Sequence, residues 1–181
     1  MAPGSTLILG IGNRLLSDQA AGIHALKAFR RACPKDEKLS FIDGGNAAAT
    51  LETPIAAAAQ LIVFDAAEFD AEPGTVRCLL GEEMDEYLRG STLSIYETGL
   101  AEALNRLRST GRCPARRALI GIQPQNVEWG EQLSQAVVNA IPWATALARE
   151  LLGRWESPDA SPDSGIFESN LAHGGRPSRR S

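Results

Sequence analysis

Metal centres and disulfide frameworks usually depend on cysteine or histidine, and this sequence has little of either. Its 181 residues include two histidines and three cysteines. The cysteines, Cys33, Cys78 and Cys113, are odd in number and widely spaced, and no Cys-x-x-Cys pair occurs. This pattern predicts reduced thiols rather than zinc ligands or disulfide bonds, and we therefore expect a cytoplasmic protein.

The chain also lacks the marks of a membrane, secreted or nucleic-acid-binding protein. No apolar run approaches the roughly 20 residues that cross a bilayer, so no membrane span is expected. The first residues, MAPGST, lack the basic and apolar regions of a signal peptide. The formal net charge of -4 argues against a surface that binds nucleic acid.

The stretch from Leu7 to Gly22 organises the rest of the chain. It begins with an apolar run closed by glycines, which is typical of a buried parallel strand. Ser17 and Asp18 then offer N-caps for a helix, so the segment predicts a strand, a tight loop and a helix. Leu15 stands where the dinucleotide fingerprint G-x-G-x-x-G needs its third glycine, and we assign no nucleotide site. A turn that serves packing alone also fits this stretch.

The following residues alternate between apolar runs and helical periodicities. Further strands are predicted at residues 39–43, 61–64, 75–80 and 118–122, and helices at 47–59, 84–89, 98–109 and 133–155. Pro142 marks a kink or restart in the last helix. Strands that alternate with helices predict an α/β fold with three layers, in which a mostly parallel, twisted sheet of about five strands carries helices on both faces.

The composition changes after Trp155. Residues 1–155 form the single predicted domain, whereas Ser, Pro, Asp, Gly and Arg dominate residues 156–181. A segment with so few apolar residues cannot contribute to a core, so we predict a disordered C-terminal tail.

Polar residues interrupt the pattern at three points where strands end or helices begin. Asp18 and Gln19 follow the first strand, Asp65 ends the third, and Tyr96 and Glu97 precede a later helix. The carboxyl ends of parallel strands meet at one edge of a sheet, so we expect these side chains to line one crevice. Asp18 is either a helix cap or a ligand. Asp65 either has a ligand or catalytic role or is a solvated loop residue.

Short motifs along the chain, from about Leu7 to Leu152, carry a family resemblance. They are Leu9–Asn13 with Leu15–Asp18, Asp43–Gly45, Leu61–Ala66, Pro73–Thr75, Thr98–Leu100 and Leu119–Pro124. In this order and spacing they resemble the hydrogenase maturation proteases. These are endopeptidases that trim the C-terminal extension of the large subunit of NiFe hydrogenases after nickel insertion.

The resemblance implies a metal site at three positions. The family has a carboxylate after the first-motif aspartate, where this chain has Gln19, and a histidine before Gly-Leu, where it has Tyr96. The aspartate that ends the central strand is present as Asp65. Glutamine ligates only through a neutral oxygen, and tyrosine only when deprotonated, against a reference pKa near 10. Glu97 is a replacement carboxylate, and Asp18 is a weaker candidate ligand.

The resemblance also implies a reaction without a serine or cysteine nucleophile. Here the serines and cysteines have no histidine base in a suitable position, because His24 lies in the first helix and His173 in the predicted tail. Asp65 is therefore the predicted catalytic residue of an aspartic-type or metal-assisted peptide hydrolysis. Nickel would arrive with the precursor of the large subunit and be held only weakly by the protein itself.

Two functions follow from the resemblance. One is a nickel-dependent endopeptidase that cleaves the large-subunit precursor, which the retained Asp65, the Asp43–Gly45 loop and the Ile122–Pro124 strand end favour. The alternative is a family member that binds the immature subunit without cutting it, as a checkpoint or chaperone. Gln19 and Tyr96, which replace expected ligands, favour this second function.

Overall fold

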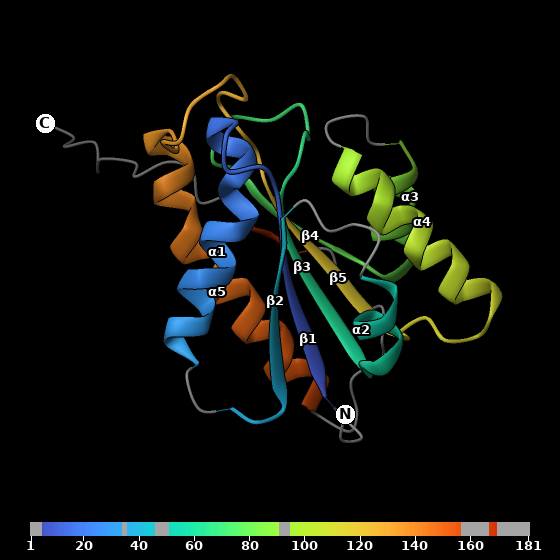
Figure 1. Cartoon of the computed structure of the whole chain (residues 1–181). Helices are drawn as coiled ribbons and strands as arrows, with labels where there is room; N and C mark the ends of the chain where they lie inside the picture. Colours follow the sequence, from blue (N-terminus) through green and yellow to red (C-terminus); the bar gives the residue numbers. More distant parts are fainter. Residues whose placement is uncertain (1–4, 34–35, 46–50, 91–94, 157–166, 170–181) are drawn as a thin grey trace, which may run out of the picture.

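A single six-stranded sheet forms the centre of the computed structural model (Figure 1). The structure describes the whole chain except residues 1–4, 34–35, 46–50, 91–94, 157–166 and 170–181. The strand order is β2-β1-β3-β5-β4-β6, and the first four of these strands are mutually parallel. Their bounds are β1 Thr6–Ile11, β2 Leu39–Gly45, β3 Gln60–Ala66 and β5 Arg116–Ile122. The predicted α/β fold with a mostly parallel sheet is confirmed.

Helices cover both faces of the sheet, as the sequence predicted. Helices α1 and α5 lie together on one face, and α2, α3 and α4 lie on the other (Figure 1). The bounds are α1 Ala21–Ala32, α2 Glu52–Ala57, α3 Gly81–Gly90, α4 Ile95–Ser109 and α5 Gln135–Glu156. None of the helices that the structure describes is long and apolar enough to span a membrane.

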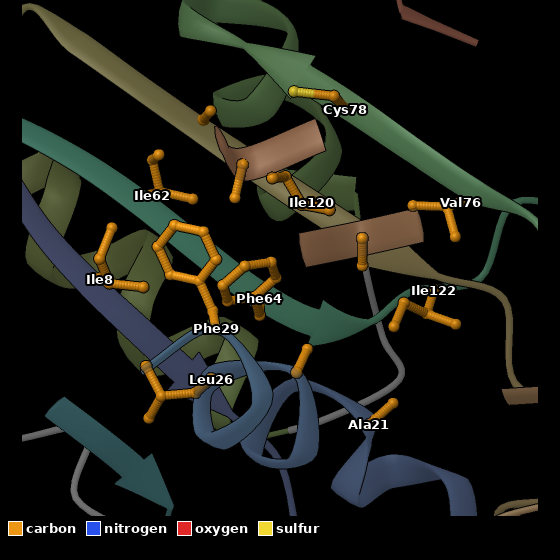
Figure 2. Close-up of a cluster of buried hydrophobic side chains, with 14 of the residues drawn as sticks. Ile8, Ala21, Leu26, Phe29, Ile62, Phe64, Val76, Cys78, Ile120 and Ile122 are labelled. Carbon is orange, nitrogen blue, oxygen red and sulfur yellow. The ribbon is translucent and has the colours of Figure 1, made fainter. Parts of the chain in front are cut away.

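Alternation along the central strands divides the core into two layers. Ile8, Ile62 and Ile120 point toward α1 and α5, whereas Leu9 and Val63 point toward the other helices. In the first layer, Figure 2 shows Phe29 of α1 pointing from the helix toward the sheet, beside Phe64. The two rings lie 5.9 Å apart between centroids, a tilted contact that adds to the burial of both side chains. The apolar runs are continuous because both faces of these strands are buried.

The far edge of the sheet differs from the prediction. Strand β4, Val76–Leu80, runs antiparallel to β5, and β6, Phe167–Ser169, pairs with β4 inside the predicted disordered tail. The sheet thus gains a strand that a run of only three residues could not reveal. Strand pairing here supplies hydrogen bonds to an otherwise open sheet edge. The rest of the tail beyond Glu156 lies outside the described residues, so its predicted disorder is not tested.

Two helices also differ in detail from the prediction. Helix α2 starts at Glu52, which puts Pro54 in its first turn, where the missing N–H costs little. The predicted helix began at Ala47, and residues 46–50 are outside the described part of the chain. Pro142 lies inside α5, which continues through it as one helix instead of restarting.

The amino end of the sheet holds a buried ion network. Asp85 of α3 is 5% exposed and accepts two hydrogen bonds from Arg117 of β5, at 3.1 Å from Nε and 2.5 Å from Nη2. Arg108 of α4 makes a further ion pair with the same carboxylate. The network therefore connects α3 and α4 to the first residues of β5, at the amino end of the sheet.

Candidate active site

Glycines shape the loop that follows β1. The loop leads into a short 3-10 helix, η1, Ser17–Ala20. Gly12 has φ +143°, and a Cβ there would lie 1.9 Å from the backbone oxygen of Gln19. A Cβ on Gly22 would lie 2.2 Å from the backbone oxygen of Phe64. Only glycine allows this close approach, which packs η1 and the start of α1 against the carboxyl ends of β1 and β3.

Asp18 holds two loops together and caps no helix. The residues at the N-cap positions of η1 and α1 are Leu16 and Ala20, and neither end has a side-chain cap. The Asp18 carboxylate is fully buried and accepts three backbone N–H groups, from Gln125 at 2.9 Å, Asn126 at 3.0 Å and Ser134 at 2.6 Å. Three N–H donors satisfy a buried carboxylate without a metal, so the geometry gives Asp18 a positioning role.

Asp65 lies where the sequence placed it, near the end of β3. It is 3% exposed and pairs in the ladder with Gly121 of β5. Its Oδ1 accepts a hydrogen bond of 2.8 Å from the backbone N–H of Ala66. Such deep burial excludes the alternative of a solvated loop residue. A buried carboxylate at the carboxyl end of a parallel strand is a candidate for a functional group.

Tyr96 and Glu97 lie in the first turn of α4, and their side chains are outside the described part of the structure. Figure 1 shows that α4 begins at the same end of the molecule as the carboxyl ends of β1, β3 and β5. The backbone therefore brings these two residues to the correct end of the sheet. Whether their side chains reach Asp65 and Gln19 stays a prediction.

His24 does not take the place of the histidine expected at Tyr96. It lies on α1, which covers the opposite face of the sheet from α4 (Figure 1). Partial burial, followed by the positive charges of Lys27 and Arg14, holds the pKa of His24 below its ordinary value. The imidazole is therefore neutral at pH 7, but the fold keeps it away from the start of α4.

Gln123 is a buried polar residue whose role the sequence did not reveal. It is 4% exposed, and its Oε1 accepts the backbone N–H of Phe69 at 2.8 Å. Its amide donates to Glu68 at 2.8 Å, and its backbone bonds to residues 74 and 75. Gln123 therefore fixes the loop that follows β3, the strand in which Asp65 lies. Its position at a strand end within a matched motif was the available signal.

Across the described residues, no three His, Cys, Asp or Glu side chains are grouped as a metal site. Gln19 does not belong to these four residue types, and the side chains of Tyr96 and Glu97 lie outside the described part of the structure. What the structure does bring together is one buried carboxylate, Asp65, and the loop that carries Gln19. This arrangement suits acid–base work on a bound substrate.

Comparisons with known proteins identify the family to which this chain belongs. The profile of the family described as hydrogenase maturation protease matches residues 23–150. The chain is similar to the hydrogenase expression/formation protein HupD of Rhizobium leguminosarum bv. viciae, with 35% identity over 169 residues, 92% of this chain and 84% of the relative. It is 34% identical over 123 residues to the hydrogenase 2 maturation protease of Escherichia coli K12, covering 67% of this chain and 74% of that one.

Solved structures show the same fold. The hydrogenase maturating endopeptidase HybD from E. coli aligns with a TM-score of 0.78 and 29% identity, covering 84% of this chain and 94% of that chain. The NiFe hydrogenase maturation protease HybD from Thermococcus kodakarensis aligns with a TM-score of 0.70 and 25% identity, covering 82% and 99%. As its motifs predicted, this chain belongs to the hydrogenase maturation protease family.

Proposed function

We propose that this protein is an endopeptidase that removes the C-terminal extension of a NiFe hydrogenase large subunit, with Asp65 as its catalytic residue. The observation that carries the proposal is the buried Asp65 at the end of β3, in a chain of the hydrogenase maturation protease family. Family membership favours cleavage over the alternative of a checkpoint or chaperone that binds without cutting. A cytoplasmic location is part of the proposal, in keeping with three thiols that form no disulfide.

The reaction that this site suits is hydrolysis by an activated water. Asp65, as a carboxylate, accepts a proton from the water while the oxygen adds to the scissile carbonyl carbon. When the C–N bond breaks, the same carboxyl group returns the proton to the leaving amine. Gln19 is half-buried on the neighbouring loop, and its amide is the proposed donor or ligand on the other side of the substrate.

Nickel enters this proposal as part of the substrate. A neutral glutamine oxygen and a protonated phenol are weak ligands, so Gln19 and Tyr96 would hold a metal poorly by themselves. Nickel already bound by precursor thiolates needs less from the protein. Asp65, and Glu97 if its side chain faces the crevice, would then supply the charged oxygen contacts.

The test is cleavage of a nickel-loaded precursor, followed as the change in its mobility on a gel. Asp65→Asn keeps the volume but removes the base, and we expect a rate at least about 100-fold below that of the wild type. A matched control is Glu52→Gln, which removes a carboxylate paired with Arg106 on the exposed surface of α2 and should cleave at nearly the wild-type rate. Cleavage by Asp65→Asn at the wild-type rate would overturn the proposed site.

A second measurement separates the protease from the checkpoint. Gln19→Glu and Tyr96→His each restore the residue type that the family uses, so both should preserve or raise cleavage if the wild type is active. If the wild type binds the precursor but never shortens it, whereas the double variant does, the checkpoint function is correct. Precursor without nickel serves as the comparison, and equal cleavage of both forms would remove nickel from the proposal.

A further inference from the structure

Three large apolar side chains are exposed on the two loops beside the candidate site. Leu15 follows β1 and is 49% exposed, while Val127 and Trp129 follow β5 and are 39% and 80% exposed. Grouped apolar exposure of this kind marks interaction surfaces more often than chance. Trp129 is the most exposed of the large hydrophobic residues that the structure describes, and tryptophan is enriched among the few residues that contribute most to binding at protein interfaces.

The backbone under these side chains is fixed by hydrogen bonds. The N–H of Gly130 donates to the oxygen of Leu15 at 2.9 Å, and the N–H of Ser17 donates to the oxygen of Gly130 at 2.6 Å. The Ser17 hydroxyl donates to the oxygen of Glu128 at 3.0 Å. Asp18 holds the same segment from below through its three accepted bonds. The apolar side chains are therefore presented in a defined arrangement before any partner arrives, which reduces the entropy lost on binding.

The surface is continuous with the candidate active site. Leu15 lies four residues before Gln19, in the loop between β1 and η1. Asp18, the neighbour of Gln19, anchors the loop after β5 that carries Val127 and Trp129. Both loops follow strands whose carboxyl ends flank Asp65. These three side chains therefore lie on the two loops that follow the strands on either side of Asp65.

We propose that Leu15, Val127 and Trp129 form the docking surface for the protein substrate, and that its occupant is an apolar patch on the folded body of the precursor. The inference rests on the proposed function. Cleavage of a folded protein near its end requires contacts beyond the few residues at the scissile bond. Surface apolar contacts of this kind tighten ground-state binding and leave the chemical step unchanged.

The test compares two tryptophans. Trp129→Ala removes the centre of the surface, and Trp143→Ala removes an indole that is 48% exposed on α5, away from both loops. Binding is measured with the nickel-loaded precursor and the Asp65→Asn background, so that no cleavage intervenes. We expect Trp129→Ala to weaken binding at least about 10-fold and Trp143→Ala to change it less than about twofold. With active protein, Trp129→Ala should raise KM and leave kcat unchanged.

Two outcomes distinguish this inference from the proposed function. If the wild type cleaves the precursor and Trp129→Ala binds and cleaves as well as the wild type, the docking surface is wrong and the protease stands. If the wild type does not cleave but Trp129→Ala still loses binding, the docking surface stands and the protease is wrong. Loss of binding by both tryptophan variants would also overturn the assignment to this surface.

Fluorescence gives an independent readout. In a Trp143→Phe background the remaining indoles are the exposed Trp129 and the buried Trp155, which is 5% exposed. Addition of precursor should shift the emission to shorter wavelength, because only Trp129 can become desolvated. The same shift on concentrating the protein without precursor would identify a second copy of this chain as the occupant and overturn the proposal.

Discussion

The two ends of the sheet each bury an aspartate, and the two carboxylates are held in different ways. At the amino end, Asp85 lies between the guanidinium groups of Arg117 and Arg108. At the carboxyl end, Asp65 is just as deeply buried, but the hydrogen bond described for its Oδ1 comes from the next residue's backbone N–H. Two cationic partners make Asp85 part of the scaffold, whereas Asp65 lies at the carboxyl end of a strand, the edge of the sheet at which the proposed site lies.

A third buried aspartate shows that location alone does not decide the role. Asp18 lies at the same end as Asp65, yet its two oxygens accept three backbone N–H groups from the loop after β5. It is engaged as completely as Asp85, though by amides instead of guanidinium groups. Asp65 is the proposed catalytic residue because it ends β3 within a matched family motif, whereas Asp18 holds the loop after β5.

The largest expected effect on stability comes from the amino end. Asp85→Asn leaves Arg117, whose side chain is 12% exposed, without its anion, and we expect a loss of about 3 kcal/mol in the free energy of unfolding. Urea unfolding measures it. The control is Glu52→Gln, because its pair with Arg106 is exposed on both sides and should cost less than about 1 kcal/mol.

The reciprocal measurement completes this comparison. Asp65→Asn should unfold at nearly the wild-type urea concentration although it loses cleavage, while folded Asp85→Asn should cleave normally. A large stability loss in Asp65→Asn would place that residue with Asp85 in the scaffold and contradict the distinction drawn between the two ends.

A smaller effect is expected for Asp18→Asn. One oxygen remains to accept, but the new amide N–H₂ faces backbone N–H donors, so we expect a loss of about 2 kcal/mol. Limited proteolysis should then cut within residues 124–134 faster than in the wild type. Protection of that loop equal to the wild type would show that Asp18 is not its anchor. The control is Asn13→Ala, which removes an exposed hydrogen bond from the backbone N–H of Leu15 in the loop after β1.

The smallest effect concerns His24 and pH. Its pKa is lowered in the folded state by burial and by Lys27 and Arg14, so the unfolded chain takes up the proton first as the pH falls. Stability is therefore complete above about pH 6.5 and declines below it. His24→Gln should show a smaller difference in unfolding free energy between pH 7.5 and 5.5 than the wild type. An equal difference in both would mean that other groups cause the decline.

Local patterns were sufficient for most of the fold. The apolar runs of β1, β3 and β5 and the helical periodicities each identify an element without knowledge of its neighbours, and their alternation predicts the layered sheet. The strand β6 was missed because three residues in a polar segment carry no pattern, and only their pairing with β4 makes them a strand. The caps assigned to Ser17 and Asp18 were wrong for a similar reason, since their partners lie more than 100 residues away.

The sequence by itself determined the family, the α/β fold and the identity of Asp65 as a polar residue at the end of a buried strand. These depend on residue type, order and short-range spacing. Only the tertiary structure decided that Asp18 anchors a loop, that Gln123 holds the segment after β3, and that Trp129 is exposed beside the site. Such roles depend on which backbone groups and side chains, distant in the sequence, come into contact when the chain folds. A hydrogen bond between residues about 100 positions apart leaves no periodic pattern in the sequence.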